Sequence, residues 1–208
     1  MSGSRVRRGK TAPVVFVLAA LVVLVMAVAA GPAAAKSQKV VSGDTHLTIP
    51  KARVSALTVQ NVAMVNISPV SFRFVWENAL SWWFNVPMDK GGTFDFAAKK
   101  GTFIHKGGLR FVNVANNTTL RLTGLRVVVN GPSSVVLSAA VGNAPVTRAD
   151  VMTATNSPAF KMQGKTASID GVQFKLTAAG VLAVQTALGV TLDSTTLFCD
   201  VDLDFKLQ

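Results

Sequence analysis

The chain has 208 residues, with 21 lysines and arginines against 10 aspartates and glutamates, one cysteine and no tyrosine. A single cysteine excludes a disulfide framework and a metal site built from several thiolates. The formal net charge is +11, but the basic residues are scattered rather than clustered, which favours an anionic cell-wall or membrane surface as partner and not nucleic acid.

Residues 1–35 have the pattern of a secretory signal peptide. Four basic residues precede an uncharged apolar run from Pro13 to Ala30, Gly31-Pro32 breaks the run, and Ala33-Ala34-Ala35 forms a cleavage site before Lys36. Because this segment holds four of the 21 basic residues and none of the 10 acidic ones, cleavage would leave a net charge of +7. We therefore expect a secreted or cell-envelope protein. The apolar run also has the length of a membrane span, so an uncleaved N-terminal anchor is the alternative.

Residues 36–208 are predicted to form a single β-rich domain. Apolar and polar residues alternate in short segments, and turn signals at Asn116-Asn117 and Asn130-Gly131-Pro132 separate several of them. The pattern predicts a mainly β fold, either an antiparallel β-sandwich or an open barrel. The predicted strands include Thr45–Ile49, Thr93–Phe96, Thr102–His105, Leu109–Val114, Thr119–Thr123, Leu125–Val129, Val135–Val141 and Val172–Leu176.

Two short helices interrupt the strand pattern. Pro50 opens the first, which we expect to run to about Leu57. Thr177 has the side chain of an N-cap for a second helix over Ala178–Leu188, and Gly189 is placed to end it.

An aromatic segment lies between Phe72 and Phe84 and holds the three tryptophans, Trp76, Trp82 and Trp83. Trp82 and Trp83 are adjacent, so in a strand they point in opposite directions and at least one is expected to be exposed or at an edge. These rings either fill the core or line a pocket for a planar or lipidic ligand.

His105 ends a predicted strand just before Gly107-Gly108, a pair that allows a tight turn or a close backbone approach. A neutral imidazole at this place is a candidate ligand for a metal or a haem iron. The alternative is a partly exposed strand histidine without a ligand role. The second histidine, His46, has only Asp44 near it, which argues against a zinc site.

The C-terminal segment offers no catalytic group. Cys199 lies within a predicted strand and is expected to be a buried apolar residue, with no histidine after it in the chain. Asp200, Asp202 and Asp204 alternate with apolar residues, which predicts a solvated face and leaves weak calcium binding open. The chain has neither a Gly-x-Ser-x-Gly elbow nor a phosphate loop, so we do not expect an enzyme.

Residues 93–141 resemble secreted actinobacterial proteins related to the HtaA haem-binding domains. The matching features are Gly101-Thr-Phe-Ile-His-Lys-Gly-Gly-Leu109, Leu120-x-Leu-Thr-Gly-Leu-Arg-Val, Leu137-x-Ala-Ala-Val, and later Phe174-x-Leu-Thr-Ala-Ala-Gly with Leu188-Gly189. The resemblance implies a β-rich domain at the cell surface. Haem-binding members use a tyrosine as iron ligand, supported by histidine, and this chain contains no tyrosine.

Three functions are consistent with these observations. The first is a secreted or envelope-associated, non-catalytic β-domain that binds a partner or has a structural role. The second, implied by the resemblance, is a haem or hydrophobic-ligand protein of haem uptake, with His105 as iron ligand and Trp76, Trp82 and Trp83 as apolar walls. The third is a hydrolase with dispersed active-site residues, for which His46, His105 and the scattered carboxylates are the candidate bases. The oligomeric state has no signal in the sequence.

Overall fold

Alternating apolar residues along most of the strands build a single antiparallel sheet. The computed structural model describes residues 36–75, 81–142 and 147–208, which hold thirteen strands and two helices. Eight strands form a barrel: β1 (Gln38–Ile49), β5 (Thr93–Asp95), β6 (Lys100–Ile104), β8 (Thr118–Gly131), β9 (Ser134–Val141), β10 (Thr147–Ala154), β12 (Thr166–Leu176) and β13 (Cys199–Leu207). Five strands extend it: β2 (Val62–Ile67), β3 (Ser71–Val75), β4 (Ser81–Pro87), β7 (Gly108–Asn113) and β11 (Ala159–Gln163).

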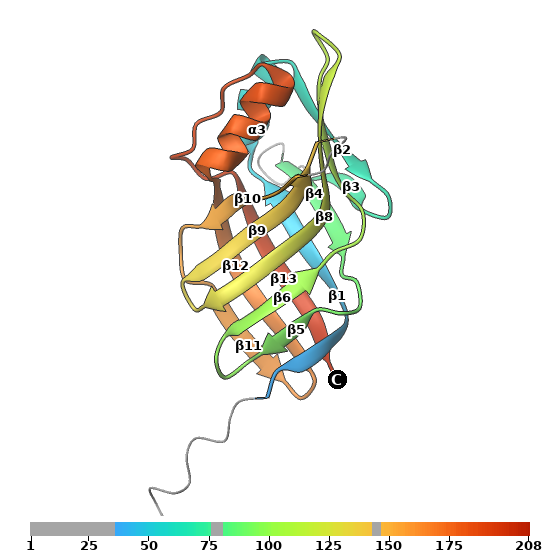
Figure 1. The fold of residues 1–208 in the computed structure, drawn as a ribbon, viewed down its shortest axis with the longest axis vertical. Coiled ribbons are helices and arrows are strands. Elements are labelled where there is room, and N and C mark those ends of the chain that lie inside the picture. The colour runs from blue at the N-terminus through green and yellow to red at the C-terminus, as the bar shows by residue number, and fades with distance from the viewer. Residues whose placement is uncertain (1–35, 76–80, 143–146) are drawn as a thin grey trace, which may run out of the picture. The chain divides into compact units, whose positions relative to one another are not determined.

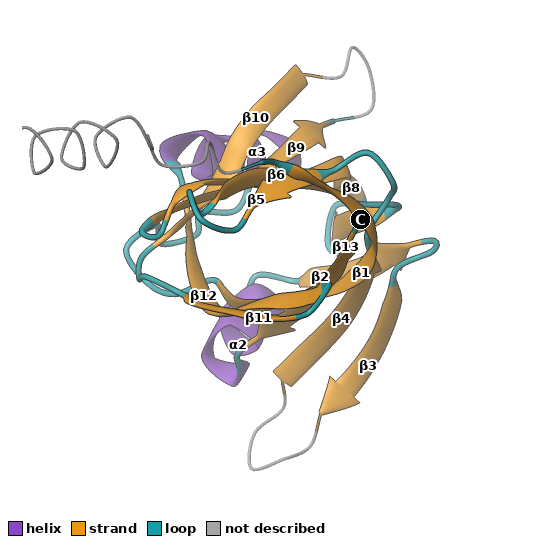
Figure 2. Ribbon diagram, turned by 90° about the horizontal axis from the view of Figure 1, so that it is seen from below, coloured by secondary structure: helices purple, strands orange, loops and turns teal. Residues whose placement is uncertain are grey.

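The barrel is closed because β1 pairs with a neighbour on each side. Its first residues pair with β5, at Gln38↔Phe94, and most of its length pairs with β13, from Val40↔Leu207 to Thr48↔Asp200. From β13 the ring continues through β12, β10, β9, β8 and β6 back to β5, and Figure 2 shows this ring from below. The mainly β prediction is confirmed. Of the two predicted architectures the chain adopts the barrel, closed where we expected it to be open.

Two long strands, β1 and β8, carry four of the five extending strands, and the fifth, β11, pairs with β12. The second half of β1 pairs with β4, and β4 with the edge strand β3. The first half of β8 pairs with β7, and β7 with β2. Thr119–Thr123 and Leu125–Val129, predicted as two strands, are one strand that a bulge near Gly124 bends between the extension and the barrel. Figure 1 shows β8 and β9 side by side across the front of the barrel.

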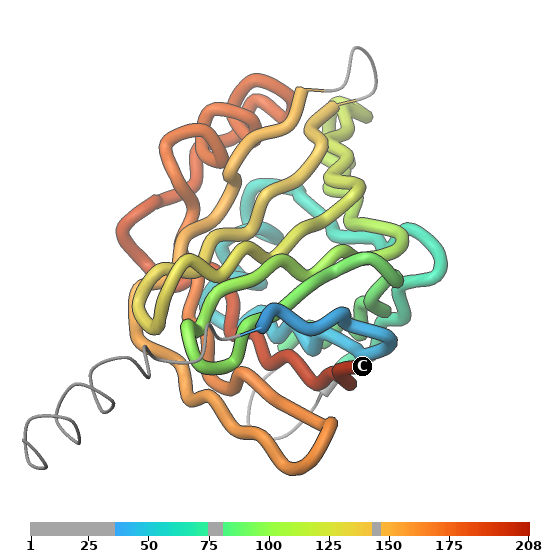
Figure 3. Tube along the Cα trace, turned by 60° about the horizontal axis from the view of Figure 1, so that its bottom comes forward, coloured from blue at the N-terminus to red at the C-terminus, as the bar shows by residue number. Residues whose placement is uncertain are grey.

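Both helices lie where the sequence predicts them. Helix α2 (Lys51–Val59) follows Pro50, and helix α3 (Ala178–Leu188) begins with Thr177, whose side chain accepts from the Gly180 amide. Gly189 ends α3 with a left-handed φ of 70°. Figure 3 traces the chain from β12 through α3 to β13, which returns to lie beside β1. No helix in the described ranges is long and apolar enough to cross a membrane.

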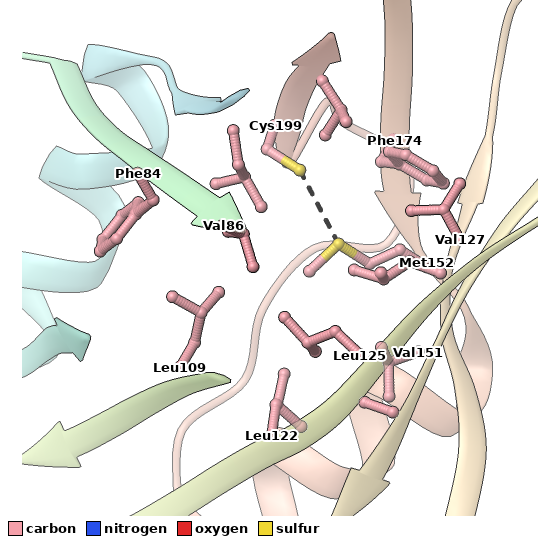
Figure 4. Close-up of a cluster of buried hydrophobic side chains, with 14 of the residues drawn as sticks. Phe84, Val86, Leu109, Leu122, Leu125, Val127, Val151, Met152, Phe174 and Cys199 are labelled. Carbon is pink, nitrogen blue, oxygen red and sulfur yellow. Dashed lines mark hydrogen bonds between the residues drawn. The ribbon is translucent and has the colours of Figure 1, made fainter. Parts of the chain in front are cut away.

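Apolar side chains fill the inside of the barrel. Phe94, Phe103 and Phe205 are at most 1% exposed, and their ring centroids lie 4.6–5.5 Å apart. Further along, Cys199 and Met152 pack among aliphatic residues and Phe174 (Figure 4). The interior is therefore a packed core rather than a channel.

Two glycines fix the turn after β6. Gly107 has φ of 73°, a left-handed conformation that side chains rarely adopt. Gly108 begins β7, where an added Cβ would overlap the carbonyl oxygen of Leu122 on β8. Both predicted uses of this pair, a tight turn and a close backbone approach, are confirmed.

Candidate functional site

His105 points into the barrel directly after β6. It is 5% exposed, which corrects the expectation of a partly exposed strand histidine. The reason is local: residue 105 bridges to Met88, and its backbone amide bonds the Leu125 carbonyl at 3.0 Å. These bonds continue the alternation of β6, so His105 faces inward like Phe103.

Both ring nitrogens of His105 have partners. Nδ1 lies 3.3 Å from the carbonyl oxygen of Leu125, which only accepts, so Nδ1 carries the proton. Nε2 then accepts from the Thr45 hydroxyl at 2.7 Å. Burial lowers the pKa of His105 to about 4, so the ring is neutral at physiological pH.

A small cavity adjoins this pair. Its volume is about 20 Å³, which is room for about one water molecule. Thr45 and His105 are its polar lining, and apolar residues such as Leu47, Phe174 and Val201 form the rest. Ligand pockets usually measure about 300–1,000 Å³, so this cavity as it stands does not admit a small-molecule ligand.

The Thr45–His105 distance is that of a hydroxyl activated by an imidazole. The pair is nevertheless sealed, since Thr45 is 4% and His105 5% exposed. A substrate would have to enter a cavity with room for only about one water molecule, so we interpret the pair as a structural contact that satisfies two buried polar groups.

The described tryptophans lie apart from His105. Trp82 faces inward on β4, 9% exposed, with its ring 6.4 Å from that of Phe72. Trp83 faces outward, with the His46 ring stacked at 5.2 Å and the Arg73 guanidinium 4.0 Å from its centroid. Neither lines the cavity beside His105. Their opposite directions are as predicted, and Trp76 lies outside the described residues.

The remaining sequence candidates are held in structural contacts. Cys199 is fully buried, its thiol donates to the Met152 sulfur at 3.8 Å, and burial raises its pKa, so it is no nucleophile. Asp202 and Asp204 are exposed on the outer face of β13, as expected, whereas Asp200 is half-buried. Asp204 Oδ2 lies 3.5 Å from His46 Nε2. In the part of the chain that is described, no three His, Cys, Asp or Glu side chains are placed to hold a metal ion.

Surface hollows are much larger than the internal cavity. Three of them have volumes of about 500, 520 and 550 Å³. The second and third share Val41 and Lys90, and Lys39, Lys106 and Lys206 also line one or the other. The space that a ligand could occupy is thus on the outside of the barrel.

Sequence reasoning missed a second basic surface. Four exposed arginines project from the outer face of the sheet: Arg110 on β7, Arg121 and Arg126 on β8, and Arg148 on β10, which β9 separates from β8. A signal was present, because residues 96–149 contain seven basic residues and no acidic one. The four arginines are far apart along the chain, so they form no cluster in the sequence. Strand pairing brings them together in the fold.

Comparisons with known proteins find solved structures of similar fold, but no matching family model or curated sequence. No protein-family model matches the chain, and no curated protein matches its sequence. The structure is similar to the C-terminal domain of HtaA from Corynebacterium glutamicum, with a TM-score of 0.56 and 17% identity over 80% of this chain and 99% of that one. A domain-swapped dimer of a histidine-to-alanine variant of that domain gives a TM-score of 0.52 and 17% identity, over 76% and 91% of the two chains. The predicted resemblance to HtaA domains is confirmed as a likeness of fold.

Proposed function

We propose that this chain is a non-catalytic binding domain of the cell envelope that recognises its partner with the outer surface of an HtaA-like barrel. Residues 1–35 would direct it out of the cytoplasm, either as a cleaved signal peptide or, if uncleaved, as an N-terminal anchor.

One observation carries the proposal: His105 and Cys199 are buried, whereas the hollows large enough for a ligand are at the surface. His105 and Cys199 are buried in contacts that satisfy them, and the cavity beside His105 measures only about 20 Å³. The surface has hollows of about 500 Å³ and an excess of positive charge. A hydrolase needs a nucleophile and a base that a substrate can reach, and these candidates do not provide one.

Binding to fractionated cell envelope tests this function. The protein, as the cell produces it, is mixed with sedimented cell wall, with membrane vesicles and with purified envelope glycans. We expect saturable retention on at least one fraction, weakened by salt because the surface is basic. Absence of retention on every fraction would contradict the proposal.

Haem or a related planar ligand is the second candidate. It is supported by the resemblance to HtaA domains and by the aromatic face of β3 and β4, where Phe72, Phe74 and Trp82 lie together and Phe74 is 53% exposed. With no tyrosine in the chain, His105 would be the iron ligand. Its apolar walls would be residues that line the cavity, such as Leu47 and Phe174, because the described tryptophans lie apart from His105. This requires His105 Nε2 to release Thr45 and the cavity to open more than tenfold.

A further inference from the structure

We propose that the outer face of β7, β8, β9 and β10 binds a linear polyanion of the cell envelope through Arg110, Arg121, Arg126 and Arg148. We name these four residues the arginine row. The proposal rests on the proposed function, because an extracytoplasmic location decides which polyanions the protein meets. The anionic groups of such a polymer are phosphates or carboxylates, and a guanidinium binds either in a bidentate fashion.

Strand pairing places two of the arginines directly opposite each other. Arg110 on β7 and Arg121 on β8 are register partners, and both are exposed. Like charges in this position destabilise an antiparallel pair. An anion that bridges the two guanidinium groups would convert that repulsion into attraction.

The other two arginines meet across β9. Arg148 lies on β10, and its side chain reaches β8, where Nη2 donates to the Gly124 carbonyl at 3.0 Å. Arg148 Nη1 also donates to Ser138 Oγ on β9 at 3.4 Å. Ser138 is the register partner of Arg126 on β8. The pKa of Arg148 is lowered by desolvation and then by the charge of Arg126, as expected for close neighbours.

No carboxylate compensates the row among the described residues. The ion pairs there join His46 to Asp204, Lys106 to Asp89 and Lys161 to Asp170. Asp150, two residues after Arg148, is the nearest acidic residue along the chain and is in none of them. The acidic side chains of β13 belong to a strand that pairs with β1 and β12, not with β7–β10.

The shape of the row favours a chain-like ligand. Arg121 and Arg126 project from the same face of β8 and are five residues apart, or at most about 17 Å at about 3.3 Å per residue. Arg148 reaches β8 at Gly124, between them. Guanidinium groups spread over this length cannot converge on one small anion, but they match successive charges of an extended polymer.

Titration with defined polymers tests the proposal. The full chain, as produced by the cell, is titrated with sodium polyphosphate, polygalacturonate, neutral dextran and duplex DNA at several salt concentrations. The Arg121→Glu/Arg126→Glu variant is compared with Lys51→Glu/Lys165→Glu, which makes the same charge change at exposed residues outside the arginine row and outside the surface hollows described above.

We expect the wild type to bind polyphosphate or polygalacturonate, and the arginine variant to bind at least tenfold more weakly while the lysine variant stays within about threefold. The slope of log Kd against log salt should fall by about half when two of four contacts are lost. Arg121→Glu places a carboxylate opposite Arg110, so the melting temperature should not fall and misfolding would not explain the loss.

Equal losses in the two variants, or tighter binding to duplex DNA than to either polymer, would overturn the proposal. Its failure is distinguishable from failure of the proposed function. If the arginine variant still binds envelope fractions like the wild type, only the arginine row is refuted. If the wild type binds no envelope fraction, the function itself is refuted.

Discussion

Replacing Phe103 by alanine should lower the free energy of unfolding by about 3–5 kcal/mol. The side chain is 0% exposed, and its ring lies 5.4 Å from that of Phe94 and 4.6 Å from that of Phe205. These three rings belong to β6, β5 and β13, strands on both sides of the β1 seam. Truncation removes the contacts that hold the seam together and leaves a cavity that rigid strands cannot fill.

Urea denaturation of wild type and variant measures this loss. Phe74→Ala is the matched control, because the same change is made at a ring that is 53% exposed on the edge strand β3. Its cost should be at most about 2 kcal/mol, since about half of the ring is exposed and its removal leaves no closed cavity. Similar losses for the two variants would show that the Phe103 cluster does not support barrel closure.

Acidification from pH 7 to pH 4 should remove about 3 kcal/mol of stability through His105 alone. Its pKa is about 4 in the folded protein against 6.5 in the unfolded chain. Between these values the unfolded chain binds a proton and the folded protein does not, so stability falls as the pH decreases through this window. Above pH 6.5 the ring is neutral in both states and the contribution no longer changes.

Denaturant titrations at half-unit steps from pH 4 to pH 8 measure the free energy of unfolding and check this pH dependence. The variant His105→Gln, which keeps polar atoms beside Thr45, should show a much flatter profile over pH 4–6.5. His46→Gln removes the other histidine, whose side chain is 31% exposed on the outer face, and should keep the wild-type slope. A wild-type profile without this slope would mean that His105 is not held neutral by burial.

Local features could be predicted from the sequence because their causes are local. Thr177 and Gly189 determine the ends of α3, and alternation along β13 separates buried Phe205 from exposed Asp204. Barrel closure could not be predicted, because it depends on β1 pairing with β13, near the other end of the chain. The inward direction of His105 has the same origin: its partner Thr45 lies 60 residues earlier.

The candidate site shows the same limit. The direction of Trp82 and Trp83 follows from their adjacency, but whether either meets His105 depends on registers that no short motif encodes. The arginine row depends on the pairing of β7 with β8 and on Arg148 reaching across β9. The only sign of the arginine row in the sequence is that residues 96–149 contain no acidic residue.

A haemin titration tests most directly whether recognition occurs outside the barrel rather than within it. Wild type and His105→Ala, both confirmed as folded by circular dichroism, are titrated with haemin while the Soret band is recorded. Since His105 is sealed with Thr45 beside a cavity of about 20 Å³, we expect no Soret shift that depends on His105. A saturable Soret shift in the wild type that the variant lacks would contradict the account and establish His105 as an iron ligand.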